Sequence, residues 1–219
     1  LRLAAVTTAG EHVLPRVLAA FRDRYPGVEV GLEVGNRSRV WDLLEHREVD
    51  LAIGGRPPAN GRFVTLATRP NVLVVVVPPA GPAGGRPTPL NEEQLGNRVW
   101  LLREPGSGTR ATVEELFEAL GIAPPTLTLG SNGAIRESVR AGLGVTLISR
   151  DAVARELERG ALVEWRGAGL PWSRAWHLVG RVGEGPTPTA RLFLGSLVTD
   201  PLDGWAPTGR RSSPRPATT

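Results

Sequence analysis

The sequence contains no lysine, no cysteine and no methionine. Without lysine, the chain can form neither a Walker-type phosphate loop nor a Schiff base, which excludes P-loop hydrolysis and pyridoxal chemistry. Without cysteine it can form neither a disulfide nor a thiolate site, an absence compatible with a reducing cytosol. Because even the initiator methionine is missing, we expect these 219 residues to be a fragment or a processed product.

Long apolar runs are absent too. The longest spans residues 72–77, whereas a helix needs about 20 apolar residues to cross a bilayer. The N-terminal stretch Leu1–Val6 lacks the charged start and cleavage site of a signal peptide, and it predicts a strand instead. We therefore expect no contact with a membrane.

Any excess of positive charge is small. The chain has 26 arginines against 22 acidic residues, a net charge of +4. Arg210, Arg211 and Arg215 lie close to the C-terminus, so the rest of the chain is nearly balanced. This balance does not predict a surface that follows the phosphates of a nucleic acid.

Signatures of catalysis are missing. The chain has no G-x-S-x-G, H-E-x-x-H or G-x-G-x-x-G motif. Its histidines, His12, His46 and His177, are scattered singly, as is more typical of surface or strand residues than of metal ligands. We expect no catalytic residue, no metal and no cofactor.

What the chain does have is a regular alternation of apolar stretches with segments of helical period, which is typical of α/β architecture. Strands are predicted over 3–6, 28–34, 49–53, 63–68, 73–77, 98–102, 126–130, 145–149, 161–165 and 175–182. Helices are predicted around 13–21 and 40–44, over 109–120, from 132, over 151–159 and from Thr187 as N-cap. Pro15 is expected in a first helical turn or at a break there.

The composition changes abruptly at residues 78–85, which are all proline, glycine or alanine. Such a segment indicates a loop or hinge, and we place a domain crossing there. The alternation of strands and helices then restarts, so two lobes should face each other across a cleft, the usual place for a small ligand. Residues 201–219 lack apolar period and are expected to be largely irregular.

Polar turns follow three of the predicted strands. The first, Thr7–Gly10, offers hydroxyls and backbone N–H groups to an anion at a strand-to-helix junction. It also allows a simple cap, with Thr8 and Glu11 forming a capping box.

The second turn, Gly106–Arg110, can also present hydroxyls and backbone N–H groups to an anion, because it contains two glycines and two hydroxyl side chains. The third turn includes Ser131 and Asn132, both ordinary N-cap types. Since ligands of open α/β sheets gather at the carboxyl ends of strands, the three turns together favour one binding site. Whether Arg103 or Arg110 faces that site stays open.

Four stretches carry a resemblance to a known family: LRLAAVTTAGEHVLPRVLAAFRDRYPGVEVGLEVGN, EVDLAIGG, REPGSGTR and SVRAGLGVTLISRDAV. Together they resemble the effector-binding domain of LysR-type transcriptional regulators, over about residues 1–199. GSGTR is more similar to the branch that regulates carbon-fixation and sulfur-assimilation genes than to the branch that recognises aromatic compounds.

The resemblance implies a type 2 periplasmic-binding-protein-like α/β fold, with two α/β subdomains joined by crossing strands and a cleft between them. Subdomain I would take residues 1–77 and 181–199, subdomain II residues 78–180, and residues 200–219 would be a flexible tail. The implied effector is a small polar or anionic metabolite, such as an oxyanion or organic acid, that controls transcription. The implied effector-binding residues are Thr7, Thr8, Ala9, Gly10, Ser107, Gly108, Thr109, Arg110, Ser131 and Asn132.

The resemblance also implies a cytoplasmic homodimer or higher homo-oligomer that is not an enzyme and contacts DNA only through an N-terminal domain that this chain lacks. Two alternatives share the fold. One is the solute-binding protein of a transporter. The other is an enzyme, for which His12 and Glu104 are the best available catalytic candidates.

Overall fold

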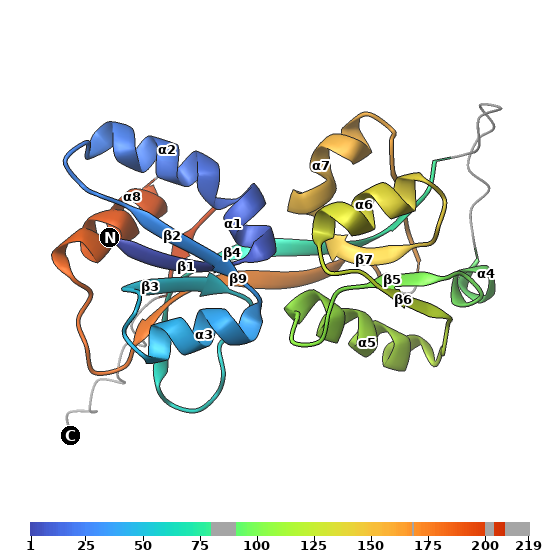
Figure 1. Cartoon of the computed structure of the whole chain (residues 1–219), viewed down its shortest axis with the longest axis horizontal. Helices are drawn as coiled ribbons and strands as arrows, with labels where there is room; N and C mark the ends of the chain where they lie inside the picture. Colours follow the sequence, from blue (N-terminus) through green and yellow to red (C-terminus); the bar gives the residue numbers. More distant parts are fainter. Residues whose placement is uncertain (80–90, 168, 200–203, 209–219) are drawn as a thin grey trace, which may run out of the picture.

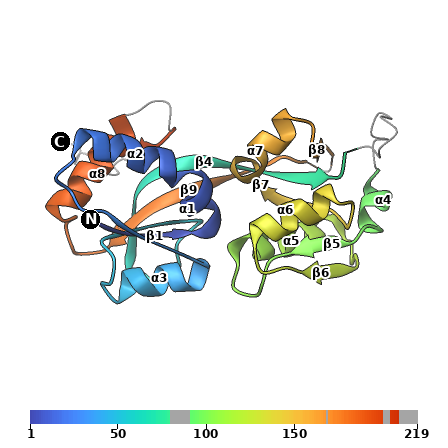
Figure 2. The same ribbon diagram turned by 45° about the horizontal axis from the view of Figure 1, so that its top comes forward.

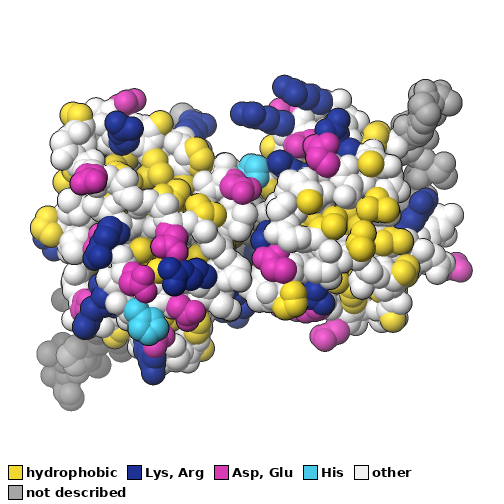
Figure 3. Space-filling view, in the orientation of Figure 1, with side chains coloured by type: hydrophobic (Ala, Val, Ile, Leu, Met, Phe, Trp, Pro, Cys, Tyr) yellow, Lys and Arg dark blue, Asp and Glu magenta, His cyan; other side chains and the backbone are white. Residues whose placement is uncertain are grey.

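Two lobes, each a sheet flanked by helices, lie side by side in the computed structural model (Figure 1). The structure describes residues 1–79, 91–167, 169–199 and 204–208. Among these residues, no helix is both long and apolar enough to cross a membrane. On the face drawn in Figure 3, acidic and basic side chains are interspersed over both lobes. The mixture agrees with the nearly balanced charge of the sequence.

The first lobe is built on three parallel strands in the order β3-β1-β2. Its strands are β1 (Arg2–Val6), β2 (Gly31–Gly35) and β3 (Leu51–Gly54), and its helices are α1 (Thr7–His12), α2 (Leu14–Arg24), α3 (Arg37–Glu45) and α8 (Pro188–Thr199). Pro15 lies in the first turn of α2, as predicted. The apolar stripe of α2 brings Phe21 edge-on to Phe193 of α8, with ring centroids 5.3 Å apart. Both rings are fully buried, so this contact anchors the core.

The second lobe repeats the plan. Its strands are β5 (Trp100–Leu102), β6 (Thr126–Thr128), β7 (Thr146–Ser149) and β8 (Val163–Trp165), and its helices are α4 (Glu92–Gly96), α5 (Gly108–Leu120), α6 (Asn132–Arg140) and α7 (Arg150–Glu158). Trp100 is fully buried at its centre, where its Nε1 donates to the carbonyl oxygen of Leu95 at 3.2 Å and its ring meets Phe117 edge-on. α5 is followed by Gly121 as its C-cap, whose φ of +63° is left-handed, and the sequence predicts this cap.

Two long antiparallel strands, β4 (Phe63–Val77) and β9 (Trp172–Arg181), run between the lobes (Figure 2). β9 pairs with β3 of the first lobe, whereas Leu73–Val77 of β4 pairs with β7 and β8 of the second. The chain therefore changes lobe within β4 rather than after residue 77, and it returns within β9 before residue 181. With these shifts, the division into two subdomains stays a prediction.

The structure corrects four local expectations. The strands expected at 63–68 and 73–77 form one strand, because the ladder to β9 continues through Pro70, which pairs with Ala175. The strand expected from residue 28 begins at Gly31, and α4 was not predicted. Within the expected tail, the strand β10 (Ala206–Pro207) pairs with β4, and the neighbouring Trp205 is buried. Residues 80–85 of the expected hinge and residues 209–219 lie outside the described residues.

Candidate functional site

The seam between the lobes is where five of the described helices begin. α1 and α3 start there in the first lobe and α5, α6 and α7 in the second, each shortly after the carboxyl end of a strand (Figures 1 and 2). The first amides of a helix lack intrahelical partners and carry partial positive charge. Their convergence makes the seam suited to an anion.

One chain of hydrogen-bonded side chains crosses the seam. The Nδ2 of Asn132, from the second lobe, donates to Oγ1 of Thr8 in the first lobe at 2.9 Å. Asn132 in turn accepts a hydrogen bond at its Oδ1 from Nη1 of Arg103 at 2.8 Å. All three residues are buried. The two lobes are therefore tied directly to each other, and a ligand that displaced either partner would change how they are held.

Arg103 faces this seam with its charge already paired. Its Nε and Nη2 donate to Oε2 and Oε1 of Glu104 at 2.7 and 2.8 Å. Burial works to raise the pKa of Glu104, but the hydrogen bonds from Arg103 outweigh it and hold that pKa below its usual value. Glu104 is thus held as a carboxylate, the opposite of what a general acid at neutral pH requires.

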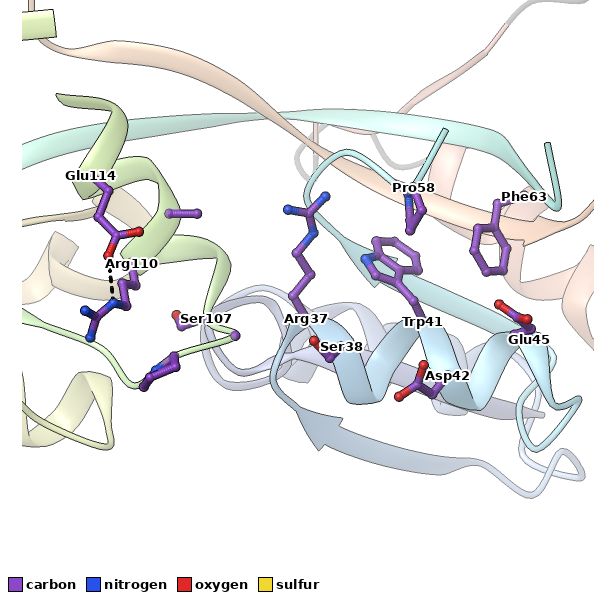
Figure 4. A pocket seen from close by; sticks show the side chains of 13 residues that line it. Arg37, Ser38, Trp41, Asp42, Glu45, Pro58, Phe63, Ser107, Arg110 and Glu114 are labelled. Carbon is purple, nitrogen blue, oxygen red and sulfur yellow. Dashed lines mark hydrogen bonds and ion pairs between the residues drawn. The ribbon is translucent and has the colours of Figure 1, made fainter. Parts of the chain in front are cut away.

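Beside the bridge, an open cavity of about 650 Å³ lies between α3 and α5 (Figure 4). Arg37, Trp41 and Phe63 line it from the first lobe, and Ser107 and Arg110 from the second. Its volume falls within the range of about 300–1,000 Å³ that is usual for small-molecule sites.

The lobes touch at one end of this cavity. The turn before α5 is tight, since Gly106 has φ +85°, a conformation that favours glycine. A Cβ on Gly108 would lie 3.8 Å from Cδ of Arg37. A ligand in the cavity would therefore contact both lobes.

The profile of the LysR substrate binding domain matches residues 1–200. The chain belongs to the LysR substrate-binding domain family. The predicted family and fold class are confirmed.

The relatives of this LysR domain are regulators of transcription. The HTH-type transcriptional regulator CbbR of Rhodospirillum rubrum is 36% identical over 198 residues, which is 90% of this chain and 65% of that protein. The RuBisCO operon transcriptional regulator of Acidithiobacillus ferrooxidans is 34% identical over 205 residues, which is 93% of this chain and 66% of that protein. The chain thus spans slightly less than two thirds of the length of these relatives.

Among solved structures, the CcmR regulatory domain of Synechocystis PCC6803 in complex with 2-PG has a TM-score of 0.82 and 31% identity, and the match covers 91% of this chain and 95% of that one. The effector binding domain of QuiR in complex with shikimate, at 18% identity and a TM-score of 0.73, shares the fold; this match covers 90% of this chain and 93% of that one.

The structure brings part of the predicted site together. Thr8 and Asn132 meet across the seam, while Ser107 and Arg110 line the cavity. Arg110 is held there by Glu114, to which its Nε donates at 2.8 Å.

Four further predicted residues lie around these. Gly108 adjoins Arg37, and Thr109 is half-buried in the first turn of α5. Thr7 donates its hydroxyl to the carbonyl oxygen of Gly35 at 3.4 Å, and Ser131 caps α6 by accepting from the amide of Ala134. Thr7 and Ser131 therefore act within their own lobes, whereas Gly108 lies where the lobes touch.

Two predicted residues point elsewhere. Ala9 belongs to the core of the first lobe, and a Cβ on Gly10 would lie only 2.7 Å from Cγ2 of Val34. The predicted capping box of Thr8 and Glu11 is wrong: Val6 is the N-cap of α1, so Thr8 already lies inside the helix and its hydroxyl is free to reach Asn132.

The cavity also includes residues of α3 that were not predicted from the sequence, above all Arg37 and Trp41. A signal was present. Asn36 follows β2 as a polar turn residue and caps α3 by accepting from the amide of Arg39, so it marks a fourth strand-to-helix junction of the same type. From the sequence alone, Trp41 is predicted to be a core residue. Its position beside the cavity follows only from the folded structure.

On the side of the seam away from the cavity, α1 contacts α7. His12 lies there with its Nε2 buried and without a hydrogen-bond partner in the described part of the chain, 3.6 Å from Oε2 of Glu11. Burial, and then the charge of Arg136, lower the pKa of His12. No cluster of potential metal ligands occurs among the described residues.

Proposed function

We propose that this LysR domain is the sensing part of a DNA-binding transcriptional regulator. The relatives carry that function in their names, and each extends well beyond the region that the chain matches. DNA would be contacted by the part of the whole protein outside this region, in agreement with the balanced charge of the domain. The family assignment favours this proposal over a transporter's solute-binding protein.

The effector we propose is a small oxyanion or organic acid held between the lobes. The observation that carries this proposal is the hydrogen bond from Asn132 to Thr8, made at the seam where helices of both lobes begin. Helix N-termini and hydroxyls bind anions without needing a full counter-charge. The similar CcmR domain, solved in complex with 2-PG, supports the same class of ligand.

Sensing requires that the ligand bind one arrangement of the lobes, or of paired subunits, better than another. A ligand with equal affinity for both arrangements shifts nothing, and typical couplings are about 1–3 kcal/mol. In this proposal the effector is released unchanged, so the domain is not an enzyme. We further propose that the protein acts in the cytoplasm as a homodimer or higher homo-oligomer.

A thermal-shift panel tests the proposed effector class. The probes are 2-PG, sulfate, phosphate and simple carboxylic acids, with glycerol as the neutral probe. At least one anion should raise the Tm of the chain, since a ligand of the folded state stabilises it by mass action. Thr8→Ala and Ser107→Ala should each reduce this rise, whereas Thr199→Ala, on the exposed end of α8, should leave it unchanged.

The outcomes separate two errors. If no anion raises the Tm of the unaltered chain, the proposed effector class is wrong. If an anion does so equally in all three variants, the chain binds anions but the assigned seam residues do not hold them.

A further inference from the structure

A second pair of side chains lies one helical turn beyond the hydrogen bond from Asn132 to Thr8. His12 follows Thr8 by four residues on α1, and Arg136 follows Asn132 by four residues on α6. Residues four apart lie on the same face of a helix. The faces that carry the hydrogen bond between the lobes therefore carry His12 and Arg136 as well, at the place where α1 meets α6 and α7 (Figure 1).

Neither member of this second pair has its ring or guanidinium nitrogen satisfied. Nε2 of His12 and Nε of Arg136 are both buried, and neither forms a hydrogen bond within the described part of the chain. Oε2 of Glu11 lies 3.6 Å from Nε2 of His12, which is too far for a hydrogen bond, and its side chain is half exposed. A proton added at Nε2 would therefore create a buried N–H without an acceptor, on a cation that lies near a second cation.

Arg136 is held in place on the second lobe. Its Nη1 donates to the carbonyl oxygen of Ala152 in α7 at 2.7 Å, and it lies 3.6 Å from Oε1 of Glu156. The guanidinium is thus tied to the backbone of α7 and cannot turn away from an approaching charge without breaking this bond. Separation of α1 from α7 is the direct way to relieve repulsion between Arg136 and a protonated His12.

The acidic groups around His12 are already engaged or exposed. Asp151 of α7 accepts hydrogen bonds from Arg69 and Trp176, and Glu156 lies beside Arg136. On the elements of the first lobe that α1 contacts, every charged side chain is exposed, so that solvent screens its charge. These side chains are Arg2 of β1, Glu33 of β2, and Arg16, Arg22, Asp23 and Arg24 of α2.

The balance of these effects favours a neutral ring while the lobes are docked. Burial, and then the charge of Arg136, lower the pKa of His12 and outweigh Glu11, Glu156 and Asp151, which act to raise it. A histidine in water titrates near pH 6.5. The docked arrangement therefore holds fewer protons than one in which the ring meets solvent, and a fall in pH through about 6.5 favours the separated arrangement.

We propose that His12 makes the docking of the two lobes sensitive to pH: its neutral ring lets α1 pack against α7, and protonation of the buried nitrogen beside Arg136 separates the two helices. Because Thr8 shares a face of α1 with His12, this movement also draws Thr8 away from Asn132. The proton then acts on the same seam as the proposed effector but at a different place, and the switch needs no ligand.

Förster energy transfer between the lobes tests this proposal on the whole chain without any ligand. Since the sequence has no cysteine, Ala19→Cys on α2 and Glu158→Cys on α7, both at exposed positions, each accept one pH-insensitive dye. The transfer efficiency should fall as the pH is lowered from 8 to 5, with a midpoint below about 6.5. Asp151 stays ionised over this range, because its pKa lies below the ordinary aspartate value.

Two variants in this labelled background separate the ring from its neighbour. His12→Gln cannot titrate, so its transfer efficiency should stay at the high-pH value throughout. Arg136→Gln removes the neighbouring charge, so the midpoint should move up toward 6.5.

The other two histidines provide matched controls. His46→Gln changes an exposed ring, and His177→Gln changes a half-buried ring whose pKa is also lowered by burial. Both controls should keep the fall in transfer efficiency and its midpoint.

The proposal is wrong if the transfer efficiency of the unaltered background does not change between pH 8 and pH 5, or if His12→Gln shows the same fall. Loss of the fall in His177→Gln alone would place the switch on β9 instead. An unchanged midpoint in Arg136→Gln would show that the buried charge is not what separates the helices, and this variant keeps the test decisive even if His12→Gln folds poorly. Since no ligand is present, none of these outcomes alters the proposed function.

Discussion

Asn132 shows how much a single residue at the seam contributes. Its amide joins Thr8 to Arg103 across the lobes and is almost completely buried. Asn132→Ala leaves both partners without their hydrogen bond, so we expect it to lower the free energy of unfolding by about 1–3 kcal/mol. Urea denaturation measures this, with the exposed Asn97→Ala as the control. A loss of the same small size in both variants would mean that the bridge does not hold the lobes together.

At the same scale, the sequence predicted which residues gather at the seam better than what each one does. Ser131 and Asn132 are both good N-cap types, and nothing in the sequence says that Ser131 caps α6 while Asn132 reaches Thr8. That division depends on how the lobes are docked, which is a tertiary property. The same applies to Trp41: its burial follows from helical period, but the lack of a partner for its N–H among the described residues follows only from the packed structure.

At the scale of elements, periodicity predicted most helices and strands because their apolar faces are regular. It failed where a strand carries polar residues for a tertiary reason. Residues 69–71 interrupt the apolar pattern of β4, yet Arg69 pairs with Asp151 and Asn71 accepts from the hydroxyl of Ser149. These contacts satisfy the polar groups where the strand passes between lobes, so the ladder continues through Pro70.

A pair of glycines tests the packing of elements. A Cβ on Gly144, just before β7, would lie 2.3 Å from the backbone oxygen of Val99, so Gly144→Ala must push β7 away from β5. We expect a loss of about 1–3 kcal/mol in the free energy of unfolding. Gly195, inside α8, has nothing near its missing Cβ, so Gly195→Ala should stabilise the chain by about 0.5–1 kcal/mol.

Thermal and urea unfolding of the two variants should therefore shift in opposite directions. Equal shifts would show that close approach at Gly144 does not limit the packing of β7 against β5.

At the scale of the whole molecule, the two-lobed plan and its family were predictable because the strand-to-helix junctions recur in both halves. The places where the chain crosses between lobes were not, since the abrupt change in composition at residues 78–85 placed the predicted boundary beyond β4, the strand within which the chain crosses. Opposite the cavity, three residues close the seam around this crossing. Asp151 of α7 accepts hydrogen bonds from both terminal nitrogens of Arg69 in β4 at 2.7 and 3.0 Å, and from Nε1 of Trp176 in β9 at 3.2 Å.

This cluster makes the stability of the molecule depend on pH. Burial works to raise the pKa of Asp151, but the hydrogen bonds and charge of Arg69 outweigh it and hold that pKa below its usual value. Since the unfolded chain then takes up the proton more readily than the folded one, the stabilisation is complete above the ordinary aspartate pKa of about 3.9 and is lost as pH falls through the lower folded value. Asp151→Asn cannot titrate, so its deficit in unfolding free energy should be largest at pH 7 and shrink as the pH falls below about 4. Urea denaturation from pH 7 to pH 3 measures this deficit, with the exposed Asp23→Asn as the control that shows none. If the deficit stayed constant over this range, the charge of Asp151 would not be what stabilises the fold. Packing alone would then link α7 to the crossing strands.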